Sequence, residues 1–406
     1  MAAGAQPRTV SLVLVREVFL IFLRLGLTSF GGPTAHLAYF REAFVVRRRW
    51  LGESAYADLV ALCQFLPGPA SSQVGMALGL HRAGVRGLLA AWAGFTLPSA
   101  ILLTLAALGL SHLEDPGSTG WLQGLMVAAV AVVAQAVLGM ARTLTPDAKR
   151  AAIAVVVLAI AALLPGVWTT VLALVLAGIL GRLLLRREAV QDDVDETQDL
   201  RVPVSRRAGG VVLLVFLALL AALPVAASVT GDGTVRLADI FYRVGSLVFG
   251  GGHVVLPMLD TEVVASGLVE NSTFLAGYGM AQAVPGPLFT FSAFLGAAST
   301  SAPTGILGAA IALVAIFIPA GLLVVAALPF WTRLRRAPAA RSVLLGVNAG
   351  VVGLLAAALY DPVFTEGITS VPAFVLAVAG FVALQKFRIP PWALVVGSAA
   401  LGLLVL

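Results

Sequence analysis

Four short motifs rich in glycine and proline interrupt the apolar runs of this chain, and they are the positions at which it could bind an anion. Two have the sequence Phe-Gly-Gly and two have the sequence Pro-Gly-Pro. Glycine permits backbone angles that other residues avoid, and proline lacks an N–H and clashes with the preceding turn, so each motif predicts a break in a helix. The motif residues are Phe30, Gly31, Gly32, Phe249, Gly250 and Gly251 in the first kind and Pro67, Gly68, Pro69, Pro285, Gly286 and Pro287 in the second.

A helix that restarts after Pro69 or Pro287 would present free N–H groups and the positive end of its dipole to the break. Helix starts of this kind bind anions, and in lipid such a break must be surrounded by protein or water. The alternative for one Pro-Gly-Pro is a plain kink or a tight turn. Two copies that follow two Phe-Gly-Gly motifs in the same order favour a binding site near the bilayer midplane, at the interface between two repeats.

Polar side chains recur near the breaks. Arg24 and Arg243 lie in apolar runs, each six residues before the phenylalanine of its motif. A charge there is costly unless it faces a partner or water, so the two together could neutralise a dianion; the alternatives are snorkelling to the interface or pairing with a carboxylate. Gln64 and Gln282 precede each Pro-Gly-Pro by three residues and could donate amide hydrogen bonds to an oxyanion, or could bond between helices.

Other polar groups distinguish the two copies. Ser71 and Ser72 follow the first Pro-Gly-Pro, whereas an apolar pair follows the second, so the first half of the site is expected to be more polar. His36 and His253 lie after their Gly-Gly turns at non-equivalent positions, and each could carry a proton or could serve in polar packing. Acidic residues are nearly absent from the apolar runs, so no buried carboxylate is expected to mark a proton or sodium path.

Composition places the chain in a bilayer. It has 406 residues, of which 60% are hydrophobic and 11% charged, and its mean hydropathy is +1.00. Apolar runs of membrane-spanning length recur from end to end. The isoelectric point of 10.1 comes from short basic clusters between these runs, which indicates topology signals rather than nucleic acid binding. The single cysteine, Cys63, allows no intramolecular disulfide, and no motif predicts a cofactor, a metal site or an enzyme.

The motifs also show an internal duplication. The first Phe-Gly-Gly returns with its arginine 219 residues later, and the first Pro-Gly-Pro returns 218 residues later. Repetition in the same order at one large offset is typical of transporters. We therefore predict a first repeat at 1–186, a cytoplasmic linker at 187–209, an unmatched transmembrane helix at 210–229 and a second repeat at 230–406.

Basic loops predict how the halves face the membrane. If the segments at 11–40 and 55–80 each crossed once, the arginines at 41–49 would lie on the side opposite Arg82 and Arg86. Re-entrant hairpins that turn at the motifs keep both basic clusters and the N-terminus in the cytoplasm. The corresponding loop of the second half, at 260–273, has acidic residues but no basic one, so it is expected outside the cell, and the second half is expected to be inverted. We predict an all-α integral membrane protein with two inverted-topology repeats, about nine full spans and four broken or re-entrant hairpins; the alternative is about 13 spanning helices.

The paired Phe-Gly-Gly and Pro-Gly-Pro motifs of this duplicated chain resemble those of the chromate ion transporter family, in its long two-domain form, over nearly the whole length. The resemblance implies export of chromate across the bacterial inner (plasma) membrane and resistance to chromate. With no nucleotide-binding motif, transport would be secondary active. Sulfate is a tetrahedral dianion like chromate, so transport of sulfate or another such oxyanion is an alternative. A membrane anion sensor or scaffold is a third reading, and both a monomer and a homodimer are compatible with the duplication.

Overall fold

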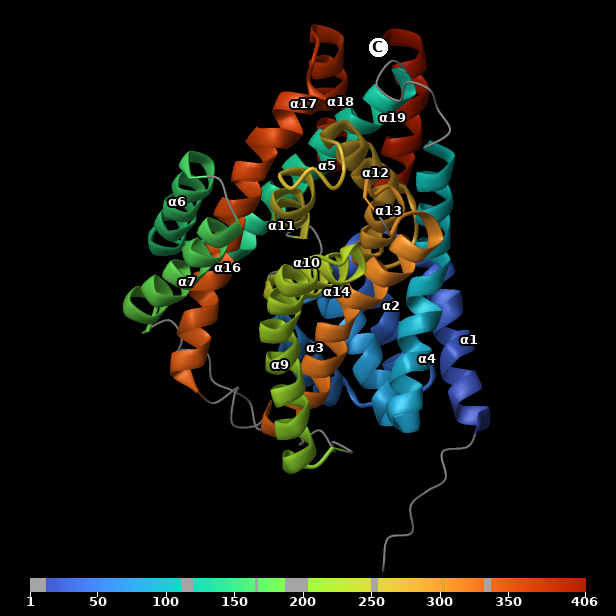
Figure 1. Cartoon of the computed structure of the whole chain (residues 1–406), viewed down its shortest axis with the longest axis vertical. Helices are drawn as coiled ribbons and strands as arrows, with labels where there is room; N and C mark the ends of the chain where they lie inside the picture. The colour runs from blue at the N-terminus through green and yellow to red at the C-terminus, as the bar shows by residue number, and fades with distance from the viewer. Residues whose placement is uncertain are drawn as a thin grey trace, which may run out of the picture.

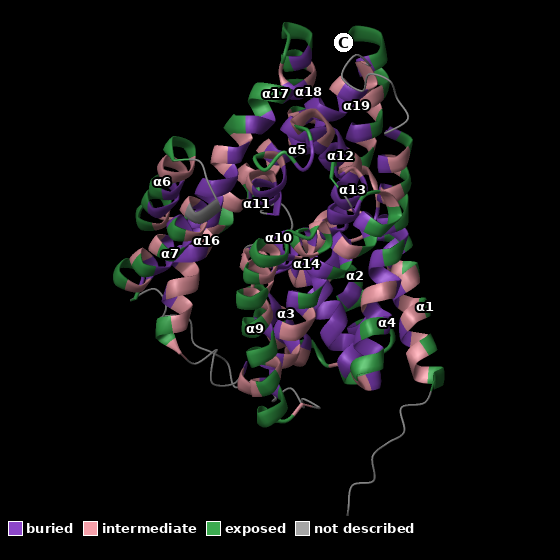
Figure 2. Cartoon of the chain, viewed as in Figure 1, coloured by how far each residue is buried: buried purple, intermediate pink, exposed green. Residues whose placement is uncertain are grey.

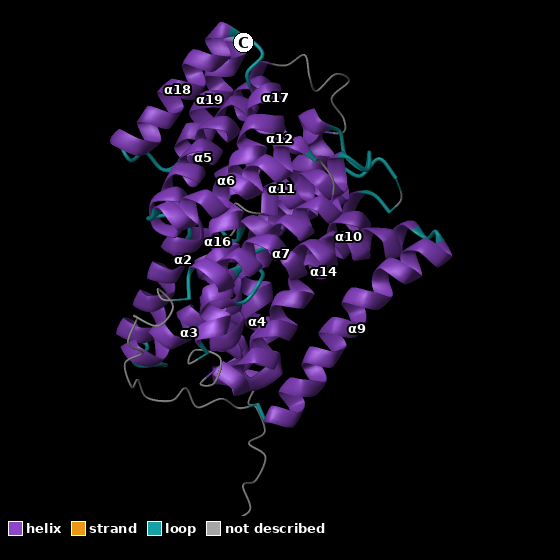
Figure 3. Ribbon diagram, turned by 90° about the vertical axis from the view of Figure 1, so that its left-hand side faces the viewer, coloured by secondary structure: helices purple, strands orange, loops and turns teal. Residues whose placement is uncertain are grey.

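The computed structural model describes residues 12–110, 120–164, 167–186, 204–249, 255–301, 303–331 and 337–406. Within these residues every regular element is a helix (Figures 1 and 3), which confirms the predicted all-α class. Many large apolar side chains face outward along these helices, as expected where the surrounding solvent is lipid. The chain is a helical membrane protein.

The first half of the chain forms two broken helical segments and then three continuous helices. The broken segments are α1 (Leu12–Thr28) with α2 (Gly32–Phe40) and the π-helical turn η1 (Arg41–Arg47), and α3 (Glu53–Phe65) with α4 (Ala70–Leu110). The continuous helices are α5 (Gly120–Leu144), α6 (Ala148–Leu163) and α7 (Val167–Leu184). Helix α9 (Arg206–Thr230) follows and contains the predicted connecting helix; most of the predicted linker, at 187–203, lies outside the described residues.

The second half repeats this order of elements. Its first part contains α10 (Gly233–Leu247), α11 (Val255–Leu259), η4 (Asp260–Val264), α12 (Asn271–Ala283), η5 (Leu288–Thr290), α13 (Phe291–Ala297), α14 (Gly305–Ala327) and η6 (Leu328–Phe330). Its second part contains α16 (Pro338–Ala358), η7 (Leu359–Phe364), α17 (Thr365–Gly367), α18 (Val371–Lys386) and α19 (Pro391–Val405). Helices α3 and α12 both have 13 residues and begin 218 positions apart, so the helices recur at the same offset as the motifs.

The predicted breaks are confirmed wherever the motifs lie in the described residues. Gly31 and Gly32 have φ angles of +101° and +75°, between α1 and α2. Gly68 has a φ of +113° between α3 and α4, and Gly286 has a φ of +101° after α12. Residues that carry a Cβ rarely adopt such backbone angles, so glycine is required for these turns. Gly250 and Gly251 of the remaining motif, together with His253, lie outside the described residues.

Both broken segments of the first repeat return to the end at which they start. The guanidinium of Arg82, late in the first limb of α4, lies 3.0 Å from the carboxylate of Glu17 in α1 and 5.1 Å from the ring centre of Trp50, which precedes α3. The chain then reverses at Ala83 and Gly84, and Gly79 touches Gly87 across the turn, so α4 consists of two antiparallel limbs.

The second repeat closes in the same way. The backbone N–H of Thr300 donates to the carbonyl of Leu268 at 2.9 Å. These residues match Arg82 and Trp50 at the 218-residue offset. Gly296 of α13 and Gly308 of α14 are in backbone contact, as Gly79 and Gly87 are in the first repeat. Each repeat therefore begins with two helical hairpins that meet at their open ends.

The later helices of each repeat pack against helices of the other repeat. Helix α5 packs against α18 and α19 of the second repeat, and α16 packs against α6 and α7 of the first (Figure 1). Small residues allow this close packing: Gly124 of α5 lies against the carbonyl of Ser398 in α19, and Gly346 of α16 lies against the carbonyl of Ala177 in α7. Neither half therefore buries its helices without the other.

Five helical stretches among the described residues are long and apolar enough to cross a bilayer. They lie at 70–110, 120–144, 206–230, 305–330 and 338–367, and four shorter apolar helices accompany them. The stretch at 206–230 is α9, which lies on the outside of the bundle, with only 6% of its most apolar 18 residues buried (Figure 2). The limbs of the broken hairpins are too short to be counted, and the number of spans stays a prediction.

Candidate functional site

The helix breaks of the two repeats are joined at the centre of the molecule. The N–H of Gly68 in the first Pro-Gly-Pro donates to the carbonyl of Val248 at the end of α10, at 2.6 Å. The N–H of Gly286 in the second Pro-Gly-Pro donates to the carbonyl of Ser29 at the end of α1, at 2.9 Å. Ser29 and Val248 are equivalent at the 219-residue offset. We name the contact of Gly286 with Ser29 the first crossing and that of Gly68 with Val248 the second crossing.

The crossings leave no room for side chains at their glycines. A Cβ on Gly286 would lie 2.9 Å from the hydroxyl of Ser99 and 3.3 Å from the carbonyl of Phe95 in α4. A Cβ on Gly68 would lie 3.1 Å from the amide of Gln73 and 3.5 Å from the carbonyl of Gly245. Both the positive φ and the close approach explain why the sequence has glycine between the two prolines.

A cavity of about 420 Å³ adjoins the first crossing, and its lining suits an anion. It contains the first Gly-Gly turn, the second Pro-Gly-Pro and parts of α5, α18 and α19, so both repeats build it. Three primary amides and one guanidinium line it, with no carboxylate among the lining residues. These lining residues are Gly31, Gly32, Pro33, Val132, Gln135, Ala136, Gly139, Arg142, Ala281, Gln282, Val284, Gly286, Leu288, Gln385 and Pro391.

Gln282 brings a buried amide to this cavity, beside the hydroxyl of Tyr278. Its side-chain nitrogen Nε2 makes no hydrogen bond of regular geometry within the described residues. A buried donor without a regular hydrogen bond costs free energy, and such a group marks a place where a ligand or water binds. Its counterpart Gln64 is exposed on α3, so the two predicted glutamines are in different environments.

A second cavity, of about 620 Å³, has the opposite charge. Asp260, Glu262 and Asp361 line it together with Asn271. Two further lining residues, Leu354 and Tyr360, are the 218-residue counterparts of Ala136 and Arg142 in the first cavity. The duplication has thus produced two related cavities, of which one carries amides and a cation and the other carries carboxylates.

The two predicted arginines are not equivalent. Arg24 is exposed on α1. The guanidinium of Arg243 on α10 lies 3.0 Å from the carboxylate of Asp239 and 3.2 Å from that of Glu262, and all three side chains are largely buried. The expectation that no buried carboxylate occurs in the apolar part of the chain was wrong. The signal was available, because Asp239 and Arg243 are spaced four apart, which places them on one face of a helix.

The remaining predicted residues lie near the crossings. His36 and the pair Ser71 and Ser72 are buried beside the first crossing. The ring of Phe30 lies 6.2 Å from that of Trp392 in α19, between centres, at the edge of the amide-lined cavity. Phe249 lines a separate apolar cavity with residues of α7 and α16. The first crossing therefore gathers His36, the two serines and, through the adjoining cavity, Gln282.

Comparison with known proteins agrees with this architecture. The family model described as "Chromate transporter" matches the chain twice, over residues 16–182 and 235–403. The chain belongs to the chromate transporter family. The two matched segments coincide with the two sets of helices and leave α9 between them, so the family unit is one repeat.

Relatives of similar length lie in bacteria and archaea. The chain is 29% identical to the chromate transport protein of Pseudomonas aeruginosa, over 85% of this chain and 80% of that one. It is 25% identical to the chromate transport protein of Cupriavidus metallidurans, over 99% and 96% of the two chains. It is also 25% identical to an uncharacterized transporter of Methanocaldococcus jannaschii, over 96% and 94%. No solved structure matches the fold.

Proposed function

We propose that this protein is a secondary active transporter that exports chromate across the bacterial inner membrane and thereby gives resistance to chromate. The observation that carries the proposal is the cavity at the first crossing, which both repeats build and which contains three amides, one guanidinium and no carboxylate. Amide N–H groups and a guanidinium are the donors that bind tetrahedral dianions. Family membership, and the names of the relatives in Pseudomonas and Cupriavidus, support chromate as the substrate.

The proposed architecture is a pair of inverted repeats with re-entrant hairpins. Two observations support it. The contacts of Arg82 with Glu17 and Trp50 bring both hairpins of the first repeat back to one end. In Figure 1, α4 ends near the top of the molecule, whereas its counterpart α14 ends near the bottom. Such repeats are expected to form a site at the membrane midplane, where broken helices from both halves meet.

The charges near the two cavities support export. Arg142, at the mouth of the amide-lined cavity, belongs to the basic stretch at 142–150, and Gln385 of the same cavity precedes Lys386. Basic loops lie in the cytoplasm, so this cavity is proposed to load from there. The acid-lined cavity includes Asn271, which follows Glu270 in the chain, and Asp361, which precedes Glu366 by five residues, and it is proposed to face outward. Its carboxylates would repel a dianion and disfavour its return.

The test is uptake of radiolabelled chromate into inside-out membrane vesicles that contain the wild type or Gln282→Leu. Loss of one hydrogen bond to a charged ligand weakens binding by about 1.5–3 kcal/mol, or roughly tenfold to a hundredfold. Gln64→Leu is the matched control, because it removes the equivalent glutamine outside the cavity. We expect uptake by the wild type and by Gln64→Leu, with a raised half-saturating concentration for Gln282→Leu.

Two outcomes would contradict the proposal. Absence of chromate uptake by the wild type under every imposed gradient would exclude chromate as the substrate. Equal effects of Gln64→Leu and Gln282→Leu would exclude the amide-lined cavity as the binding site. Sulfate is the second candidate substrate, because the amides and guanidinium of the cavity recognise its charge and shape equally well. Strong competition by sulfate, with faster sulfate than chromate uptake, would make it the substrate.

A further inference from the structure

The two crossings have the same backbone geometry but opposite side-chain chemistry. At the first crossing, polar residues lie around the hydrogen bond between Gly286 and Ser29, and in the second repeat all of their counterparts but one are apolar. The polar set is Ser29, His36, Ser71, Ser72, Thr96 and Ser99, and their counterparts are Val248, Val255, Phe289, Thr290, Val314 and Phe317. Gln73, the next polar residue of α4, lies at the second crossing, where its side-chain nitrogen donates to the carbonyl of Pro67. One repeat has diverged toward polar residues, and the other toward mainly apolar residues.

Hydrogen bonds connect the polar set to the first crossing. Nδ1 of His36 lies 3.3 Å from the hydroxyl of Ser71, and Nε2 lies 3.2 Å from the carbonyl of Ser29. That carbonyl also accepts the N–H of Gly286. His36 therefore links α2, the start of α4 and the Pro-Gly-Pro of the other repeat, and it is a positioning residue for the crossing.

Several polar atoms of this set are buried without partners. The hydroxyls of Ser29, Ser72 and Thr96 have no hydrogen-bond partner within the described residues. These three residues are 0–3% exposed. Unpaired buried polar groups cost stability, so their presence at one site calls for a function that uses them. Hydroxyls can turn to donate to an anion or to the water that accompanies it.

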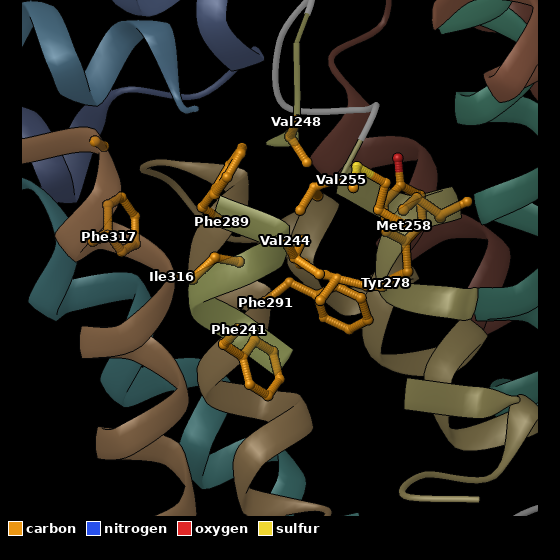
Figure 4. Packing of buried hydrophobic residues seen from close by; sticks show 14 of the residues in the cluster. Phe241, Val244, Val248, Val255, Met258, Tyr278, Phe289, Phe291, Ile316 and Phe317 are labelled. Atoms are coloured by element: carbon orange, nitrogen blue, oxygen red, sulfur yellow. The ribbon is translucent and has the colours of Figure 1, made fainter. Parts of the chain in front are cut away.

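The second crossing is mainly apolar, and Gln73 is the polar residue placed there, with its side-chain oxygen unpaired. The rings of Phe289 and Phe317 lie 6.0 Å apart, and Val248 and Val255 are fully buried beside them (Figure 4). The hydroxyl of Thr290, the counterpart of Ser72, already donates to the carbonyl of Pro287. Ser292 of α13 carries an unpaired hydroxyl, but its counterpart is Val74 and it does not belong to the compared positions.

We propose that the transported oxyanion crosses the midplane at the first crossing alone, where the hydroxyls of Ser29, Ser72 and Thr96 form an inner subsite that replaces part of the water around a tetrahedral dianion. The second crossing, lined mainly by apolar side chains, carries no ion. This inference rests on the proposed transport function, because Gly286 both lines the amide-lined cavity and forms the first crossing. The path through the duplicated protein is thus single rather than double.

The first test measures water access at two equivalent positions. Cys63 is the single cysteine of the chain, so Cys63→Ala provides a cysteine-free background. In it, Ser72→Cys and Thr290→Cys are exposed in open membranes to a small charged methanethiosulfonate reagent. We expect at least tenfold faster labelling of the cysteine at 72 than of that at 290. Equal labelling of both, or no labelling at 72, would overturn the inference, provided that both variants elute as monodisperse protein in detergent.

The second test measures transport. Ser72→Ala and Thr96→Val remove unpaired hydroxyls of the proposed subsite, and Ser292→Ala removes one outside it. We expect the first two variants to lower the initial rate of chromate uptake at least fivefold at matched expression, and Ser292→Ala to leave it within twofold of the wild type. Equal losses in all three, or none in the first two, would overturn the single path. Absence of uptake by the wild type would instead overturn the proposed function, while the labelling still decides whether the crossings differ.

Discussion

Arg243 gives the most direct test of the packing at the second repeat. Its guanidinium lies between the carboxylates of Asp239 and Glu262, at 3.0 Å and 3.2 Å. Only 17% of the Arg243 side chain and 8% of each carboxylate side chain are exposed. Arg243→Gln would leave two negative charges in a largely buried site without a cation. Removing one partner of a buried ion pair costs about 3–5 kcal/mol, and here two acids lose the same partner.

The expected effect is on folding stability. For large domains, 1 kcal/mol corresponds to about 2 °C or more in melting temperature, so Arg243→Gln is expected to lower the melting temperature by roughly 6 °C or more. The matched control is Arg24→Gln, which changes the equivalent arginine of the first repeat. Arg24 is exposed and its side chain is far less constrained, so its substitution is expected to stay within about 0.5 kcal/mol of the wild type.

The assay is thermal unfolding of purified protein in one detergent, followed by a thiol-independent dye or by loss of monodisperse protein. A triple variant that combines Arg243→Gln with Asp239→Asn and Glu262→Gln removes all three charges. We expect it to recover most of the lost stability, because replacing a whole buried ion cluster by neutral groups is often nearly neutral. If Arg243→Gln melts like the wild type but abolishes chromate uptake, Arg243 binds substrate and the structural assignment is refuted.

Two further predictions concern glycines. Gly286→Ala places a Cβ at a residue with a φ of +101°, 2.9 Å from a side chain of α4. We expect the free energy of unfolding to fall by about 1–3 kcal/mol and chromate uptake to be lost. Gly210→Ala, whose Cβ meets open space, should behave like the wild type in both measurements. Gly124→Ala forces α5 away from the carbonyl of Ser398 in α19, so a lower melting temperature is expected than for the control Gly397→Ala; equal melting of these two variants would contradict the exchanged packing.

The helix breaks and the duplication could be predicted from the sequence because both have local signatures. A glycine between two prolines can hardly continue a helix, whatever surrounds it. The positive φ angles of Gly68 and Gly286 follow directly from that local chemistry. The constant offset between motifs extends to the helices because each repeat folds from similar local sequence, as the identical lengths of α3 and α12 show.

The exchange of helices between the repeats had no such signature. Helices α5 and α16 have the same apolar composition whether they pack within their own repeat or across it. The spacing of Gly120 and Gly124 indicates close packing of α5 with another helix, but it does not identify the partner. Contacts between residues more than 150 positions apart are decided by the shape of the whole bundle, which local pattern does not contain.

The arginines show why a repeated residue need not repeat its role. Arg24 and Arg243 occupy the same position in their repeats, and the sequence left three roles open for both: neutralising a dianion, snorkelling to the interface or pairing with a carboxylate. The neighbours differ: Asp239 precedes Arg243 by four residues, whereas the position that precedes Arg24 by four residues is Leu20. A charge in an apolar helix requires a partner or exposure. Arg243 pairs with carboxylates, whereas Arg24 is exposed at the surface, so the two copies meet the same requirement in different ways.

Divergence of the two copies gives the two sides of the proposed carrier different affinities for an anion. Two identical halves related by inversion would present the same groups to an ion from either side, so binding alone would not favour one entrance. Here the amide-lined cavity and the polar first crossing share Gly286, while the related cavity carries Asp260, Glu262 and Asp361. An anion is attracted by the first set and repelled by the second. The duplication supplies the common hairpin scaffold, and the substitutions on it give each side its own electrostatic character.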